Sequence, residues 1–256
     1  MNKSNVDLIN DSYDHYMFGT QRVSFDKIGF FNFGYWKGID GSIELAQINL
    51  IETLISFFPD KSGTVLDVAC GKGASTKYLT KYFDPRNITG INISERQLEV
   101  CRVVAPECTF KLMDATRLDF QESSLDNLLC IEAAPHFMTR YEFLKETYRV
   151  LRAGGRLSMS DMLYDKYWLD LIGPAHPKEN YLKDLEAYRE LLREIGFKYI
   201  RVEDSTDFGM KALAQFETRR LETHFCKRPE REVLEEIEKW RDASDHMICC
   251  MVYAIK

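Results

Sequence analysis

The stretch from residue 65 to residue 74 constrains the fold of this chain more than any other part of the sequence. Its apolar run, its glycines and the residues that follow indicate a buried strand, a tight turn and the start of a helix over about Ser75 to Phe83. Gly71 and Gly73 allow positive φ angles and let a ligand approach the backbone closely. An ordinary strand-to-helix turn would also fit these residues taken alone.

The next sixty residues repeat the pattern of strand and helix. Residues 88–93 are rich in β-formers, and Ser94 with Gln97 supplies a capping box for a helix over 95–104. Residues 109–113 and 125–131 are two further short strands. Because crossovers between parallel strands are right-handed, this β-α-β-α order predicts a parallel α/β sheet.

A polar residue follows each apolar run of the predicted strands. These residues are Asp67, Asn92, Asp114 and Glu132. The carboxyl ends of parallel strands meet at one edge of a sheet, and ligands of such sheets bind in the crevice beyond that edge. The helix after Gly73 would also present its unpaired N–H groups there. The sequence therefore predicts a ligand site at this edge.

The ordered set of motifs resembles the class I S-adenosylmethionine-dependent methyltransferases. The matching pieces are Asp67-(x)3-Gly71-x-Gly73 and the segments 90–94, 113–115, 131–137 and 150–156. This resemblance implies a Rossmann-like, seven-stranded, mostly parallel sheet with helices on both faces and an antiparallel edge strand. An N-terminal helical cap and lid insertions would complete it. Residues 33–36 and the Ser94/Gln97 pair resemble the small-molecule branch that contains tocopherol, sarcosine-type and natural-product methyltransferases.

The resemblance implies a set of contacts for the cofactor, S-adenosylmethionine. Asp67 would lie near its ammonium group, and Gly71 and Gly73 against its methionine and ribose portions. Asp114 would meet the adenine amine, while the backbone N–H of Ala115 would bond to the adenine ring. No metal is expected.

Further cofactor contacts involve two departures from the family pattern. Ala69 replaces the first glycine of the motif, which suits a backbone in the β region. Asn92 replaces the acid that binds the ribose; an amide can accept from one hydroxyl and donate to the other, with Gln97 as its helper. Glu132 would lie under the methionine end. A nicotinamide dehydrogenase would need a third glycine and an acidic ribose ligand, so this alternative is disfavoured.

Residues 13 to 36 are unusually aromatic. Large rings pack well against a core, so many of them would simply hold this segment in place. Alternatively, the segment closes over the cofactor, where aromatic faces attract a sulfonium by about 0.5 to 2 kcal/mol. The resemblance gives this second role to Tyr16 and Tyr35.

Methyl transfer depends mainly on holding the acceptor in line, which supplies roughly 7 to 11 kcal/mol in the best model reactions. His136, in the loop after the fourth strand, is the candidate general base, because imidazole titrates near neutrality. A structural, hydrogen-bonded histidine is the alternative. His15, Trp168 and His176 are candidates for the acceptor pocket. Asp161 and Asp165, at the end of a fifth strand predicted over Arg156 to Met162, would face the same pocket and bind a cationic acceptor or order a loop.

Composition excludes several classes of partner. The chain has 256 residues, a formal net charge of −6 and no cluster of Lys and Arg, so nucleic acid is not an expected partner. No apolar stretch approaches the roughly twenty residues that span a bilayer, so no membrane association and a cytoplasmic location are expected. The seven cysteines lack ligand-like spacing except at 249 and 250, and fit a core role better than metalloid binding.

The chain divides into three predicted regions. Residues 1–59 form the N-terminal helical cap, 60–163 the cofactor-binding Rossmann-like core, and 164–256 the lid insertions with the last two strands. Within the last region, Phe197 to Val202 is a sixth strand, 206 to 245 one or two charged helices, and 246 to 255 the final strand.

The predicted function is transfer of a methyl group from S-adenosylmethionine to an O, N or C nucleophile of a small, specialised metabolite. The expected partner is this small-molecule acceptor, and the protein would be a monomer or homodimer. Two alternatives stay open. One is a protein that binds the cofactor without methylating, as a cyclase scaffold or noncatalytic subunit. The other is a cyclopropane-type lipid enzyme, although no residues that would hold its bicarbonate are recognisable.

Overall fold

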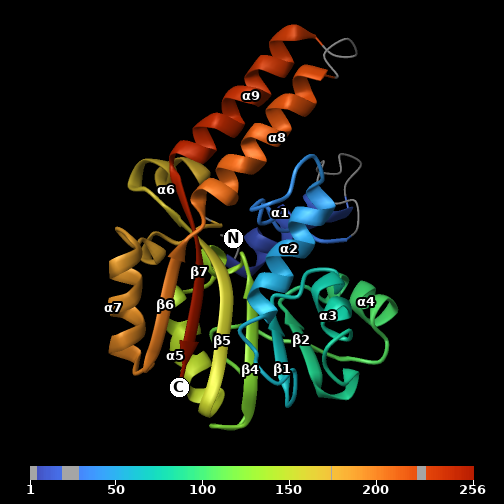
Figure 1. Ribbon diagram of the computed structural model, residues 1–256, viewed down its shortest axis with the longest axis vertical. Helices are drawn as coiled ribbons and strands as arrows, with labels where there is room; N and C mark the ends of the chain where they lie inside the picture. The colour runs from blue at the N-terminus through green and yellow to red at the C-terminus, as the bar shows by residue number, and fades with distance from the viewer. Residues whose placement is uncertain (1–4, 19–28, 174, 224–228) are drawn as a thin grey trace.

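A seven-stranded sheet forms the centre of the computed structural model, which describes residues 5–18, 29–173, 175–223 and 229–256 (Figure 1). The strand order across this sheet is β3-β2-β1-β4-β5-β7-β6. The strands are β1 (Val65–Val68), β2 (Ile88–Asn92), β3 (Thr109–Leu112), β4 (Leu125–Ile131), β5 (Leu151–Tyr164), β6 (Tyr199–Asp204) and β7 (Met247–Ile255).

The direction of the strands confirms the predicted fold class. β3, β2, β1, β4 and β5 are mutually parallel, and β7 runs antiparallel to both of its neighbours, β5 and β6. The last two strands therefore form an antiparallel pair at one side of the sheet, with β6 outermost. Reversal of the strand order beside β1 creates the crevice where ligands of such sheets bind.

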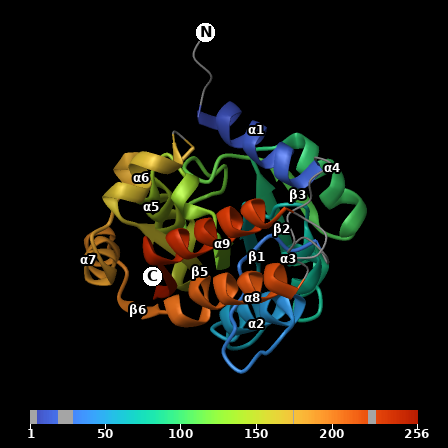
Figure 2. The same cartoon turned by 90° about the horizontal axis from the view of Figure 1, so that it is seen from above.

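Helices cover both faces of this sheet. The α-helices are α1 (Asn5–Phe18), α2 (Ile43–Ile55), α3 (Ala74–Leu79), α4 (Glu95–Val104), α5 (Arg140–Val150), α6 (Lys166–Ile172), α7 (Leu185–Ile195), α8 (Met210–Thr223) and α9 (Glu230–Asp245). The short 3-10 helices are η1 (Pro85–Asn87), η2 (Ala134–His136), η3 (Lys178–Asn180) and η4 (Thr206–Phe208). Figure 2 looks down on the sheet and shows α2 and α5 on opposite sides of it.

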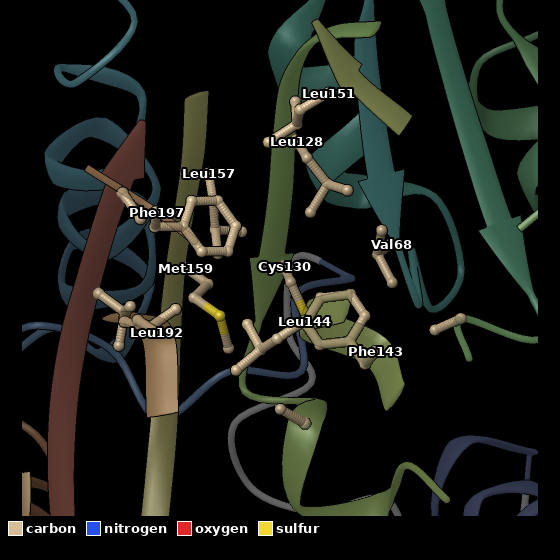
Figure 3. Close-up of a cluster of buried hydrophobic side chains, with 14 of the residues drawn as sticks. Val68, Leu128, Cys130, Phe143, Leu144, Leu151, Leu157, Met159, Leu192 and Phe197 are labelled. Atoms are coloured by element: carbon tan, nitrogen blue, oxygen red, sulfur yellow. The ribbon is translucent and has the colours of Figure 1, made fainter. Parts of the chain in front are cut away.

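Alternation of side chains along the strands produces two hydrophobic cores. Leu128 of β4 packs with α5 and α7, whereas its neighbour Leu129 packs with α2 and α3. Figure 3 shows the first of these cores, in which Phe143 of α5 and Leu192 of α7 lie against Met159 of β5. Both layers are needed because parallel strands bury both of their faces.

The capping predictions are confirmed for the central helices. The hydroxyl of Ser94 accepts a hydrogen bond from the N–H of Gln97, 3.3 Å away, and α4 covers the predicted residues. α3 is shorter than predicted and ends at Leu79. The N–H groups of residues 80–82 bond to carbonyls three residues back, so the last turn tightens before Pro85, which disfavours helix in the residue preceding it.

The largest error in strand length is at β5. This strand begins at Leu151, whereas the predicted strand began at Arg156. The register between β4 and β5 shifts at this point, and Gly154 has a φ of +79°. The glycines therefore form an irregularity within the strand and do not delay its start. The sixth strand is also displaced, starting at Tyr199 instead of Phe197.

Among the residues described, the segment between β6 and β7 forms two α-helices, and the prediction was one or two helices over residues 206 to 245. α8 and α9 lie side by side and project beyond the carboxyl edge of the sheet (Figure 1). Across the described part of the chain, each helix is too short or too polar to cross a lipid bilayer.

Candidate functional site

A cavity lies at the carboxyl edge of the parallel strands and is lined by seven of the predicted site residues. Its empty volume is about 1140 Å³, part of it open to solvent. The predicted residues that line it are Gly71, Asn92, Gln97, Asp114, Ala115, Glu132 and His136. The prediction that the strand ends share one edge is therefore confirmed.

Asp67 lies behind the glycine loop and braces it. Its carboxylate Oδ2 accepts hydrogen bonds from the hydroxyls of Ser75 at 2.7 Å and Thr76 at 2.6 Å. Burial raises the pKa of Asp67 to about 6, although both hydroxyl bonds favour the charged form. Asp67 is 1 % exposed and is not among the residues that line the cavity. Its direct role is to tie the start of α3 to the end of β1.

The glycine loop follows β1 through a series of left-handed residues. Ala69 has a φ of +55° and Gly71 a φ of +55°, so the prediction of a β conformation for Ala69 is wrong. The loop turns two residues before the first glycine of the pair, and alanine occupies a position that favours glycine. Among the residues that the structure describes, an added Cβ at Gly71 would meet only the methyl of Met17, at 3.9 Å, so these residues leave the space above its backbone open to a ligand.

At Gly73, glycine is needed because a neighbouring helix packs closely against the backbone. It precedes α3 with a φ of +87°, and a Cβ there would lie 3.1 to 3.3 Å from three atoms of Cys101 in α4. Gly73 does not line the cavity. It allows α4 to pack closely behind the loop.

Asn92 and Gln97 form a hydrogen-bonded pair on the cavity wall. The Asn92 amide donates to Gln97 Oε1 at 2.9 Å and to the carbonyl of Gly71 at 3.3 Å. Its own Oδ1 accepts from the N–H of Ser94 at 3.1 Å. The pair therefore links the end of β2, the start of α4 and the glycine loop, and it presents amide groups without charge to a ligand.

Asp114 and Ala115 follow β3 and line the next part of the cavity. Asp114 Oδ1 accepts from both the N–H and the hydroxyl of Thr116, each at 2.8 Å. These bonds fix the carboxylate in a turn. Its second oxygen, Oδ2, has no hydrogen-bond partner among the residues that the structure describes, so it can accept from a bound ligand.

Glu132 lies where the cofactor residues meet the loop after β4. Its Oε2 accepts from the backbone N–H of Phe33 at 2.8 Å, which joins this strand end to the N-terminal segment. Burial raises the pKa of Glu132 to about 8, so its carboxyl is mostly protonated at pH 7. Its backbone φ is +53°, a strained value for a non-glycine residue.

His136 is held in one orientation at both ring nitrogens. Nδ1 lies 3.1 Å from the carbonyl oxygen of Ala175, and Nε2 lies 2.8 Å from the hydroxyl of Tyr13. The pKa of His136 is lowered, mainly because the ring is buried, so the ring is neutral. A carbonyl can only accept, so Nδ1 carries the proton and Nε2 accepts from Tyr13. The lone pair on Nε2 is therefore directed at the Tyr13 hydroxyl, and both residues line the cavity.

Sequence reasoning missed the face of α1 that closes the cavity. The lining residues of this helix are Val6, Ile9, Asn10, Tyr13 and Met17. Their spacing of three and four residues is that of one helical face, and this signal is present in the sequence. Asn10 also donates to the carbonyl of Ile93 at 3.3 Å, which ties α1 to the end of β2.

Several predicted residues lie elsewhere. Tyr35 is outside the cavity, because its N–H bonds to Ala46 of α2 and its ring packs on Phe208. Trp168 stacks on His246 at 5.7 Å and does not line the cavity. His176 also lies outside it but contacts His136, with ring centroids 4.3 Å apart.

Tyr16 and His15 belong to α1, but their side chains lie outside the described part of the structure.

The prediction that Asp161 and Asp165 face the acceptor pocket is wrong. Because β5 continues to Tyr164, Asp161 is an internal strand residue, 1 % exposed, and forms an ion pair with Arg140 at 2.7 Å. Asp165 caps α6 by accepting from the N–H of Trp168. Neither carboxylate lines the cavity.

Neither thiol nor metal chemistry is supported in the described residues. Cys249 and Cys250 are buried within β7, and burial raises the pKa of each thiol. No group of three or more potential ligands that could hold a metal ion is found among the residues described.

Comparison with known proteins identifies the family. The methyltransferase domain family matches residues 66–159. The O-methyltransferase cnsE of Penicillium expansum is 32% identical over 205 residues, which cover 75% of this chain and 74% of that protein. The 27-O-demethylrifamycin SV methyltransferase of Amycolatopsis mediterranei is 29% identical over 201 residues, 72% of this chain and 74% of that protein.

Solved structures share the fold at low identity. Phosphoethanolamine N-methyltransferase 2 of Haemonchus contortus, in complex with S-adenosyl-L-methionine, has a TM-score of 0.74 at 20% identity and covers 100% of this chain and 60% of that one. The [4+2]-cyclase SpnF has a TM-score of 0.67 at 22% identity, covering 89% and 88%. The chain belongs to the class I S-adenosylmethionine-dependent methyltransferases of the small-molecule type. It is an enzyme, and S-adenosylmethionine is its methyl donor.

The residues of the cavity fit this cofactor. The open space above Gly71 would be filled by a Cβ, the Asn92 amide lies beside it, and Asp114 retains an acceptor oxygen further along the same wall. When bound, the cofactor supplies a methyl group on a positively charged sulfur, which a nucleophile can displace in line. The protein has to bind this cofactor and orient the acceptor.

Proposed function

We propose that this enzyme methylates a hydroxyl group of a small, largely apolar organic acceptor, with His136 as the general base. One observation carries the proposal: the neutral His136 lines the same cavity as Asn92 and Asp114, and the hydroxyl of Tyr13, another residue of the cavity wall, lies 2.8 Å from its Nε2. An acceptor hydroxyl that replaced the Tyr13 hydroxyl would donate its proton to the same lone pair.

The character of the cavity wall supports an uncharged acceptor. The parts contributed by α1, residues 29–32 and the loop after β4 are mostly apolar. Glu132, whose pKa is raised to about 8, brings no full negative charge at pH 7 to attract an ammonium group. The relatives named as O-methyltransferases favour oxygen over nitrogen and carbon as the atom methylated. Natural products are the corresponding acceptor class, since one relative is named for a rifamycin.

For the cofactor we propose one role for each part of the wall. Gly71 receives the methionine portion against its open backbone, and the Asn92–Gln97 pair binds the ribose hydroxyls. Asp114 accepts from the adenine amine and the N–H of Ala115 donates to the ring. The support is that all five residues line one cavity in the order of the strand ends.

The test is incubation of the purified protein with methyl-labelled S-adenosylmethionine and a panel of phenols and alcohols, each paired with the matching amine. We expect label in the ether product of a hydroxyl compound and little in its amine counterpart. Label that appears only in amines would contradict the proposal. Conversion of an acceptor with the cofactor intact would favour a non-methylating cyclase, the activity named for SpnF. Label in a cyclopropane ring of an unsaturated lipid would favour the lipid enzyme.

A further inference from the structure

The loop that carries His136 is held at its backbone by a single buried side chain, that of Asn180. This residue ends η3 and is 6 % exposed. Its side-chain Nδ2 lies 3.0 Å from the carbonyl oxygen of Pro135 and 2.8 Å from that of Phe137. These two residues lie on either side of His136, so one amide fixes the backbone on both sides of the proposed base.

Asn180 is itself held by a buried cluster, the Arg140 cluster, which consists of Arg140, Asp161, Asn180 and Tyr188. Asn180 Oδ1 accepts from the backbone N–H of Arg140, and its carbonyl accepts from the Arg140 guanidinium. The guanidinium also donates to Asp161 at 2.7 Å and 3.2 Å. The Tyr188 hydroxyl donates to the same carboxylate at 2.7 Å. The cluster thereby anchors η3 to β5 and α7.

The residues just before Asn180 orient the imidazole ring. The carbonyl of Ala175 accepts from His136 Nδ1, and the ring of His176 lies against the ring of His136. The segment 175–180 therefore contacts the ring edge, the ring face and the flanking backbone of His136. A shift of this segment would alter all three.

A buried asparagine that donates to two backbone carbonyls can also have a purely structural role, and the chain contains an example. Asn127 in β4 is 6 % exposed, and its Nδ2 donates to the carbonyls of Ser62 at 3.1 Å and Thr64 at 3.2 Å. These contacts lie at the start of β1, at the opposite end of the strand from the cavity. Asn127 thus matches Asn180 in burial and chemistry but not in location.

We propose that Asn180 is a positioning residue for the methyl transfer reaction: it holds His136 so that Nδ1 stays on the Ala175 carbonyl and Nε2 stays aimed into the cavity. This inference rests on the proposed role of His136 as base. Asn180 touches neither cofactor nor acceptor and acts through the loop backbone.

The experiment compares Asn180→Ala with Asn127→Ala in the complex with S-adenosylhomocysteine. Each variant loses buried hydrogen bonds, so each should lower Tm by about 2 to 8 °C. Imidazole ¹⁵N NMR reads the tautomer and pKa of His136, with its signals assigned by their loss in His136→Gln. We expect Asn180→Ala to mix the two tautomers and raise the pKa of His136 toward that of an exposed histidine. Asn127→Ala should leave both unchanged, and S-adenosylhomocysteine should still bind both variants.

The proposal would be overturned if His136 kept its wild-type tautomer and pKa in Asn180→Ala. Equal changes of both quantities in Asn180→Ala and Asn127→Ala would also overturn it. If Asn180→Ala does not fold, Asn180→Asp takes its place with the same criteria, because it keeps the shape and the Oδ1 acceptor but, when ionised, has no donor for the two carbonyls. The measurement needs no acceptor. Failure of the base role would instead appear as normal turnover of His136→Gln, whatever the NMR result.

Discussion

The two ends of the cavity are built in different ways. At the end proposed to bind the cofactor, Gly71, Asn92 and Asp114 lie at or just after the ends of three neighbouring strands, β1, β2 and β3. At the acceptor end, His136 is held by residues 123 and 39 positions away in the chain, Tyr13 and Ala175. The first end follows from the sheet, whereas the second is assembled by long-range contacts across its edge.

This difference teaches which parts of the site can vary independently. The loops of the cofactor end are continuous with β1 to β3, so a change there also disturbs the strand ends. The contacts at the acceptor end come from α1 and the segment 175–180, both outside the sheet. Binding of the cofactor and turnover of the acceptor should therefore respond to different substitutions.

The largest effect is expected for His136→Gln. Glutamine can still hydrogen-bond but cannot take up a proton near neutrality, so turnover should fall about 10² to 10⁴-fold. Affinity for S-adenosylhomocysteine, measured by calorimetry, should not change. Turnover is measured with an acceptor identified in the labelling assay.

His246→Gln is the matched control for that variant. His246 lies at the junction of α9 and β7, where it pairs with Asp165, and it does not line the cavity. Its substitution should leave turnover near that of the wild type. Near-normal turnover of His136→Gln would remove His136 from the reaction, and equal losses in both variants would point to a general effect on folding.

An intermediate effect is expected for Glu132→Gln, at the boundary of the two ends. Burial raises the pKa of Glu132 to about 8, above its ordinary value of 4.5. Since the folded protein holds this proton more tightly than the unfolded chain, wild-type stability falls as pH rises from about 4.5 to about 8. Glutamine keeps an acceptor for Phe33 and does not ionise. Over this window, the free energy of unfolding of the variant should rise relative to that of the wild type by an amount on the order of 5 kcal/mol.

The pH range over which stability changes should differ between variants at Glu132 and at Asp67. Asp67→Asn should likewise gain stability relative to the wild type as pH rises. This gain should be complete by about pH 6, because the pKa of Asp67 is raised only to about 6. Tm of the ligand-free proteins, followed from pH 4 to pH 9, measures both. Parallel Tm curves for the wild type and Glu132→Gln would show that the carboxyl is not held protonated in the folded state.

The cofactor end could largely be predicted from the sequence because its signals are local. Ser94 as a cap fixed the start of α4, and the polar residues that end the strands identified the shared edge. The two local predictions that failed also have local causes. The turn begins at Ala69, and alanine rarely takes a positive φ. Gly154 and Gly155 are part of β5.

The acceptor end could be predicted only in part. His136 was found because it follows a strand, but its partner Tyr13 was one of many aromatic residues, with nothing local to distinguish it. Asp161 was misplaced because the partner that buries it, Arg140, is separated from it by most of a helix and a strand. Contacts of this kind depend on how distant segments pack, which periodicity and capping signals do not encode.

The smallest effect is expected for Asp114→Ala, which tests the cofactor end alone. Loss of a charged acceptor for the adenine amine should weaken binding of S-adenosylhomocysteine by about 1.5 to 3 kcal/mol in calorimetry. Asp84→Ala is the control, because Asp84 likewise accepts from the N–H two residues further on, at 3.0 Å, but lies outside the cavity. If both ends are independent, Asp114→Ala at saturating cofactor should turn over acceptor at the wild-type rate. A matching loss of turnover would mean that the wall around Asp114 and the loop that carries His136 are coupled. Unchanged affinity would mean that the adenine binds elsewhere.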